Sequence, residues 1–204
     1  MPMYLQFLLQ TTDVVVEYVF RESLEYDLLI ATITGILSGI IASGLFFLTL
    51  RVFKPKIQIA SKIVKQQTTN DLGEPEIIYW FKFINMTKAD IENVSIDLFL
   101  MEDFFNGSAK NYNTKRLKIA QPEFKFLTGK GKRSTETYNN CVQMKILEPL
   151  EEMWNGKKEW LHLQIDSTHS QSGRRKVHVK KYQDPSSAIS NGKFDSGENF
   201  NILN

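Results

Sequence analysis

The sequence predicts a mainly β protein, an antiparallel β-sandwich or small barrel, preceded by an N-terminal amphipathic helix and one transmembrane helix. Two observations support this fold class. Residues 28–50 are 23 residues without a formal charge, enough for a helix to cross about 30 Å of hydrocarbon. After Pro55 the apolar residues alternate along the chain, which is the pattern of half-buried strands. A chain of 204 residues has room for one ordinary domain and this N-terminal appendage.

Residues 1–27 are expected to form a separate interfacial helix. The stretch 3–20 is apolar enough to touch lipid, but it contains Gln6, Gln10, Asp13 and Glu17, which make a buried span costly. We therefore expect a partly amphipathic helix at the outer membrane–water interface or packed against the span. The alternative is a second, imperfect transmembrane helix, which would return the N-terminus to the cytoplasm.

The charges that flank residues 28–50 predict the orientation of this transmembrane helix. Five basic residues follow it closely, namely Arg51, Lys54, Lys56, Lys62 and Lys65, whereas Arg21 is the one base before it, among five acids. Residues 1–50 carry a net charge of −4, and residues 51–204 carry +6. By the positive-inside rule, the N-terminus lies outside and the C-terminal domain is cytoplasmic.

Small residues on one face of the transmembrane helix predict self-association. Gly35 and Gly39 form a GxxxG motif, accompanied by Ala31, Ser38, Ala42 and Ser43. Small residues let helix backbones approach closely and gain van der Waals contact. These six residues are the predicted helix–helix contact or pore lining of a homo-oligomer, and the alternative is a monomeric anchor. Hydroxyls such as that of Thr32 could line a water path, although in membrane helices they more often bond back to their own backbone.

Residues 51–55 are predicted to be a juxtamembrane linker, since Pro55 cannot continue the helix, and residues 56–204 a cytoplasmic β domain. The expected strands are 56–65, 76–84, 93–101, 115–119, 133–139, 160–167, 174–182 and a short piece near 200–203. Residues 147–154 are the one expected helical insert. Residues 183–199, rich in Ser, Asn, Asp and Gly, are expected to be a surface loop that leads to the last strand.

Two clusters of basic residues follow glycine-containing loops and are the candidate ligand-binding residues. They are Lys130, Lys132 and Arg133, and Arg174, Arg175 and Lys176. Glycine-rich turns expose backbone N–H groups, and long cationic side chains attract phosphate, so these clusters favour a nucleotide or oligonucleotide ligand. The alternatives are a solvated loop or a surface attracted to anionic lipid headgroups.

The sequence offers no complete catalytic or metal-binding constellation. It has one cysteine, Cys141, and three scattered histidines, and it contains no GxSxG, HExxH, P-loop or CxxC motif. Cys141 is expected to be an ordinary half-buried residue. The run 166–170 collects Asp, Ser and His within five positions, but adjacent side chains diverge rather than converge on one substrate. We therefore expect a protein that is not an enzyme and has no metal or cofactor.

The layout of the chain resembles the small membrane effectors of bacterial antiphage systems that respond to nucleotide signals. The residues that carry this resemblance are GILSGIIAS in the span, the basic KPK after it, and the strand RKVHVKKY near the end of a β-rich domain. More loosely, the β domain resembles the cytoplasmic sandwich of inward-rectifier potassium channels. The potassium-filter sequence TVGYG is absent, so ion selectivity does not carry over.

The effector resemblance implies a homo-oligomer in a bacterial inner membrane that forms a pore when its cytoplasmic domain senses a nucleotide-type signal. A nucleotidyltransferase that makes the signal is the implied partner protein. The alternative function is a membrane-tethered binding or accessory module without a pore. Membrane lipid is a partner under both hypotheses.

Overall fold

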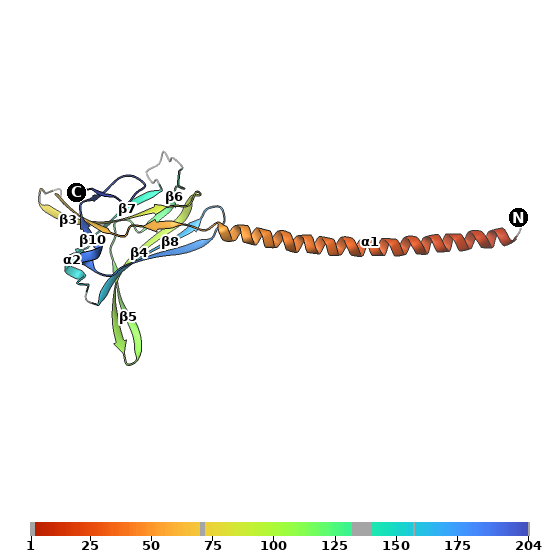
Figure 1. Cartoon of the computed structure of the whole chain (residues 1–204), viewed down its shortest axis with the longest axis horizontal. Coiled ribbons are helices and arrows are strands. Elements are labelled where there is room, and N and C mark those ends of the chain that lie inside the picture. The colour runs from red at the N-terminus through yellow and green to blue at the C-terminus, as the bar shows by residue number, and fades with distance from the viewer. Residues whose placement is uncertain (1–2, 70–71, 132–139, 157, 204) are drawn as a thin grey trace. The chain divides into compact units, whose positions relative to one another are not determined.

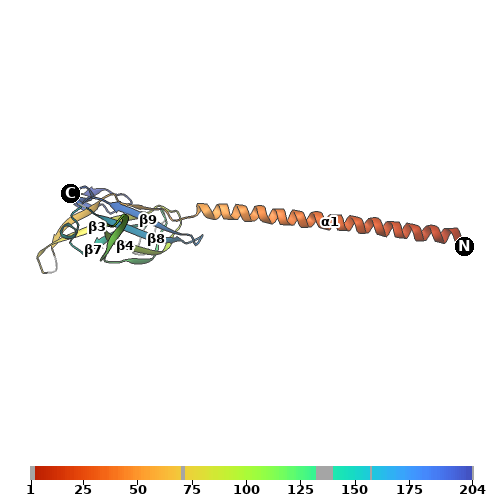
Figure 2. The same cartoon turned by 90° about the horizontal axis from the view of Figure 1, so that it is seen from below.

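The computed structural model describes residues 3–69, 72–131, 140–156 and 158–203, with side chains from residue 25 onward. The chain divides into two compact units, Met1–Val52 and Phe53–Asn204. The first is a single helix and the second is built mainly from strands (Figures 1 and 2). The predicted fold class, mainly β with a preceding helix, is confirmed.

Helix α1 (Met3–Val52) is continuous over 50 residues. The helix passes through the boundary expected near residue 27 without a break in the backbone. The physical reason lies in residues 21–27, RESLEYD, which contain neither Gly nor Pro to interrupt the hydrogen-bond ladder. Helix α1 ends at Val52, shortly before Pro55.

The part Glu25–Val52 of α1 is long and apolar enough to cross a membrane, and none of it is buried. Two of its threonine hydroxyls bond back to the helix itself. Thr32 Oγ1 donates to Leu28 O at 2.8 Å, and Thr49 Oγ1 donates to Leu45 O at 2.8 Å. The bonds of these two hydroxyls to their own helix are those expected of an ordinary membrane helix.

Two five-stranded sheets form the β domain. The first contains β1 (Ile57–Ile59), β2 (Ile63–Thr69), β3 (Pro75–Asn85), β7 (Cys141–Ile146) and β10 (Ile189–Asn191). The second contains β4 (Ile91–Asn106), β5 (Ala109–Leu117), β6 (Glu123–Leu127), β8 (Glu159–His169) and β9 (Arg175–Tyr182). The pairs within these sheets are antiparallel except β10 with β2. A hairpin of β11 (Lys193–Phe194) and β12 (Ile202–Leu203), and the single turns α2 (Leu150–Met153) and α3 (Pro185–Ala188), complete the described elements.

One apolar core joins the two sheets. Phe81 and Phe83 of β3 belong to the same buried cluster as Leu98 of β4 and Leu163 of β8. The strand β4 needs a bulge to supply this core, because Ile91 and Val94 are three positions apart and both are buried. The register shifts between Glu92 and Ser95, and Asn93 adopts a φ of 50°, a left-handed conformation that asparagine tolerates.

Several predicted strands differ from the observed ones. The expected strand 56–65 is split into β1 and β2, which follow one another along the same edge of β3. The expected strands 93–101 and 115–119 belong to one long hairpin, β4–β5, with its turn at Gly107. The sequence analysis missed β6 and β7. The predicted strand 133–139 lies wholly outside the described residues.

The C-terminal segment, residues 183–203, is more ordered than the expected surface loop. It forms α3, β10 and the β11–β12 hairpin, and Phe194 is buried against Ala60 and Val64. Lys82 of β3 holds this segment, although its side chain is 0% exposed. Its Nζ donates to Asp195 O at 2.5 Å and to Gly197 O at 2.7 Å. Two backbone carbonyls thus accept the hydrogen bonds that this buried ammonium group would otherwise donate to water.

Candidate functional site

The candidate site is the end of the β domain at which the chain enters it from α1. The entry segment, residues 53–57, is held there by hydrogen bonds to three other parts of the domain. Lys56 N–H donates to Thr87 Oγ1 at 2.8 Å, and Ile57 N–H donates to His178 Nε2 at 3.1 Å. Ser172 Oγ donates to Phe53 O at 2.6 Å. Phe53 directly follows α1, so the turn that carries Ser172 is bonded to the first residue of the domain.

Two loops that carry predicted ligand residues meet at Asp90 at this same end. The first basic loop is residues 128–131, after β6, and the second basic loop is residues 170–174, between β8 and β9. Gly129 N–H donates to Asp90 Oδ1 at 2.8 Å, and Ser170 N–H donates to Asp90 O at 3.2 Å. Lys130 N–H also donates to Thr87 O at 2.7 Å. The turn before β4 therefore connects both basic loops to the entry segment.

Buried residues set the path of the first basic loop. Asn85 is completely buried, and its Nδ2 donates to Thr128 O at 2.9 Å while its Oδ1 accepts the Thr87 N–H at 2.9 Å. Gly129 must be glycine, because a Cβ atom there would lie 2.2 Å from the carbonyl oxygen of Lys88. This close approach keeps Lys88 and Lys130 on neighbouring backbones.

The structure brings only some of the predicted ligand residues together. Lys130 and Arg174 are exposed on the two loops that meet at Asp90, and Lys176 is partly exposed on β9. Lys132 and Arg133 lie outside the described residues. Arg175 instead forms an ion pair with Asp166 of β8: its Nε donates to Asp166 Oδ2 at 2.7 Å, and its Nη2 contacts the same oxygen. This carboxylate raises the pKa of Arg175 through hydrogen bonding and charge attraction.

Further cations that the sequence analysis did not connect with the clusters lie at this end. The sequence predicts a role in topology for Lys54 and Lys56 and no particular role for Lys88. All three are exposed. We call the following six residues the basic end: Lys54, Lys56, Lys88, Lys130, Arg174 and Lys176. Two acids nearby are engaged, Asp90 with Gly129 and Asp166 with Arg175, while Glu92 is exposed.

His178 connects β9 to the entry segment in a neutral state. Burial, together with the smaller effect of the positive charge of Lys176, lowers its pKa to about 4. Neutral Nε2 accepts the Ile57 N–H, which a protonated nitrogen cannot do. The histidine is therefore part of the attachment of the entry segment.

Stability should accordingly fall in mild acid. The unfolded chain binds a proton at His178 near pH 6.5, whereas the folded domain resists it down to about pH 4. The free energy of unfolding is then unaffected above about pH 6.5 and declines as the pH drops from there toward 4. Urea unfolding at several pH values measures this slope. His178→Gln keeps a hydrogen-bond acceptor that does not titrate, so it should flatten the dependence of the free energy of unfolding on pH. An unchanged slope would mean that other groups cause the loss of stability in acid.

The predicted helix–helix residues all lie exposed on α1. Ala31, Gly35, Ser38, Gly39, Ala42 and Ser43 are solvent-accessible, and a Cβ atom added at Gly35 or Gly39 would meet no other atom within 4 Å. Ser38 Oγ donates to Gly35 O at 3.0 Å. The small-residue face is thus available to another helix.

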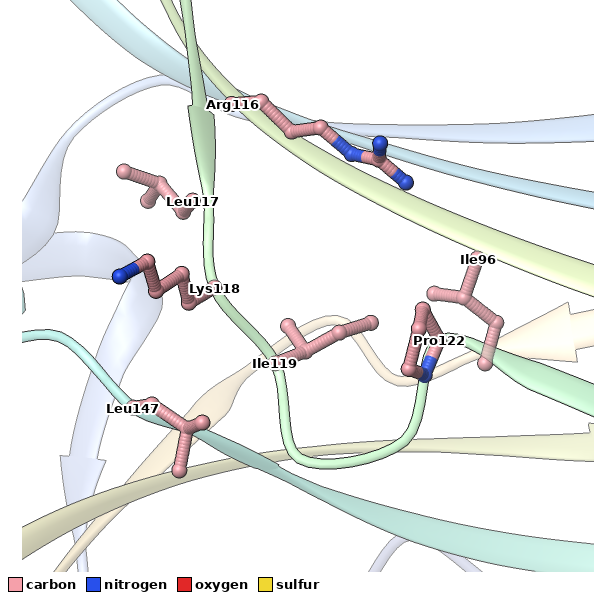
Figure 3. Close-up of a pocket in the computed structure, with 7 residues that line it drawn as sticks. All are labelled: Ile96, Arg116, Leu117, Lys118, Ile119, Pro122 and Leu147. Carbon is pink, nitrogen blue, oxygen red and sulfur yellow. The ribbon is translucent and has the colours of Figure 1, made fainter.

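A separate groove lies between the end of β5 and the connection to β6 (Figure 3). Its volume is about 460 Å³, and its lining is Ile96, Arg116, Leu117, Lys118, Ile119, Pro122 and Leu147. Ile119 points toward Pro122 and Ile96, whereas the Lys118 side chain points away from them (Figure 3). Arg116 forms an ion pair with Asp97 at 2.5 Å. Among the predicted ligand residues that the structure describes, none lines this groove.

Side chains suited to metal binding do not gather in the described part of the chain. No set of three or more His, Cys, Asp or Glu side chains there could hold a metal ion. Cys141 is half-buried in β7, as expected, and burial raises the pKa of its thiol. His169 Nδ1 accepts the Ser172 N–H at 3.3 Å, which shapes the second basic loop. No known protein family matches the chain, and no curated protein shows significant similarity to it.

Proposed function

We propose that the chain is a homo-oligomeric membrane effector of bacterial antiviral defence, in which a phosphate-bearing, nucleotide-type signal acts on the basic end and controls a pore formed by α1. The proposal places α1 across the inner membrane, with the N-terminus outside and the β domain in the cytoplasm. A nucleotidyltransferase would supply the signal.

The observation that carries this proposal is the bond between the second basic loop and the entry segment. Ser172 lies two residues before Arg174 and donates to Phe53 O, directly after α1. A ligand that moves this loop therefore acts on the backbone that leads into the membrane helix. Such a ligand opens or closes a pore only if it binds two arrangements of the oligomer with different affinities.

Self-association should depend on Gly35 and Gly39. Replacing both with Leu puts bulky side chains where the exposed small-residue face lets two helices approach. We expect the detergent-solubilised oligomer to dissociate and any membrane depolarisation in expressing cells to disappear. Replacing Ile33 and Ile40, on the bulkier face, with Leu is the matched control. An oligomer that survives the glycine changes would place the contact in the β domain.

The orientation is tested with reporter fusions to the C-terminus. The basic residues after α1 predict a C-terminal domain in the cytoplasm. A fused alkaline phosphatase should therefore be inactive and a fused fluorescent protein bright. An active phosphatase would reverse the orientation and remove the β domain from any cytoplasmic signal.

A tethered binding module without a pore is the second candidate. The observation in its favour is the ion pair with Asp166, which engages Arg175, one of the predicted ligand residues. Under this function the Gly35 and Gly39 changes would leave cellular activity intact even if the oligomer dissociates. A dye-release assay with the full chain in vesicles separates the two functions directly.

A further inference from the structure

We infer that the headgroups of anionic phospholipids occupy the basic end at rest, and that a soluble phosphate ligand must compete with them. The inference deepens the proposed function by naming a resident ligand of the same site. It requires that α1 spans a membrane, and it requires neither a pore nor an oligomer.

Only a short length of chain separates α1 from the first cations of the basic end. Lys54 and Lys56 lie two and four residues after Val52, the end of α1. Four residues span at most about 14 Å even when fully extended. The headgroup region is about 5–8 Å thick on each side of the hydrocarbon, and charges act over a Debye length of about 8 Å at physiological salt. The entry segment therefore stays within the electrostatic field of the lipid surface, however the β domain is oriented.

Contacts within the β domain link the segments of Lys88, Lys130 and Arg174 to the entry segment. Thr87 accepts the Lys56 N–H through its side chain and the Lys130 N–H through its carbonyl. Lys88 is the next residue, and its carbonyl oxygen lies against Gly129. On the other side, Ser172 connects the loop of Arg174 to Phe53. These contacts attach the segments that carry Lys88, Lys130 and Arg174 to the entry segment that the chain tethers near the membrane.

The spread of the cations favours a lipid surface over one small ligand. Lys56, Lys88, Lys130 and Arg174 are exposed and project from four different segments of the chain. A lipid leaflet presents many phosphates side by side, so each cation can meet a separate headgroup. Basic residues next to an anionic leaflet contribute additively, each improving binding by about five-fold.

The test measures lipid retained by the full-length protein in detergent micelles. Native mass spectrometry follows the titration with phosphatidylglycerol, phosphatidylcholine or inorganic triphosphate. The loss variant is Lys56→Gln/Lys130→Gln/Arg174→Gln. The matched control removes three exposed charges elsewhere, Lys115→Gln/Lys158→Gln/Lys193→Gln. Thermal unfolding of each variant checks that the fold is kept, and Lys56→Arg/Lys130→Arg should bind as the parent does.

We expect the parent to prefer phosphatidylglycerol to phosphatidylcholine, and the loss variant to bind phosphatidylglycerol about 100-fold more weakly. The control should keep the preference, and triphosphate should displace phosphatidylglycerol from the parent. Equal retention of the two lipids, or an unchanged loss variant, would overturn the inference. Tight triphosphate binding without any phosphatidylglycerol preference would make a soluble phosphate the resident ligand. A monomeric protein without a pore would still show the lipid preference, so the two proposals fail separately.

Discussion

Replacing Lys82 with Glu should release the C-terminal segment from the β domain and lower the free energy of unfolding by roughly 4 kcal/mol or more. The Lys82 side chain is 0% exposed, and its ammonium group donates to the carbonyl oxygens of Asp195 and Gly197. A carboxylate in its place would be buried and would face two carbonyl oxygens of partial negative charge. It could donate a hydrogen bond to neither of them. The ring of Phe194, 5.9 Å from Nζ, would likewise change from an attractive to a repulsive neighbour.

Urea unfolding and limited proteolysis measure these two effects on the full chain. Residues 193–203 should become sensitive to protease at urea concentrations that leave the parent intact. Lys82→Met keeps the apolar stem and buries no charge, so its cost should be smaller, about 1–3 kcal/mol for the carbonyls left without a donor. Lys193→Glu, exposed on β11 of the same segment, should change stability by less than about 0.5 kcal/mol. A Lys82→Glu variant as stable as the parent would mean that the C-terminal segment is held by its other contacts.

Strict alternation indicated β4 in the sequence, whereas β7 was missed although its burial alternates as well. In β4, the residues Val94, Ile96, Leu98 and Leu100 are all buried and share one face. The strand β6 escaped prediction because its buried residues, Phe124 and Leu127, are three positions apart and so break the two-residue period. The pairing of β10 with β2 joins residues more than 120 positions apart, and no local pattern indicates such a contact.

In the candidate site, too, the sequence indicates local features but not the contacts between distant segments. The two basic clusters are visible in the sequence, but their meeting point depends on Asp90, whose backbone and side chain bond to different loops. Lys88 joins the site only because Gly129 packs against its backbone. The fate of Arg175 is decided by strand register, since Thr168 pairs with Arg175 and brings Asp166 within reach of its guanidinium.

Arg174 and Arg175 should therefore respond differently to charge reversal, although they are adjacent in the sequence. Arg175→Glu would place a second carboxylate beside Asp166, whose side chain is only 10% exposed. The two adjacent carboxylates would repel each other. Asp166 would also lose the guanidinium that offsets the free-energy cost of burying its charge. We expect a marked fall in the thermal unfolding midpoint of this variant. Arg174→Glu changes an exposed position, so the midpoint should stay close to that of the parent.

Phosphate binding should show the opposite order. Arg174 belongs to the basic end, and reversing its charge should weaken phosphatidylglycerol binding about 30-fold, as expected for two units of charge near an anionic surface. The charge swap Asp166→Arg/Arg175→Asp re-forms the ion pair across β8 and β9 and should recover much of the stability lost by Arg175→Glu. Recovery by the swap would identify Arg175 as a structural residue. If Arg175→Glu instead unfolds like the parent and loses phosphate binding, Arg175 is a ligand residue whose bond to Asp166 gives way when the ligand arrives.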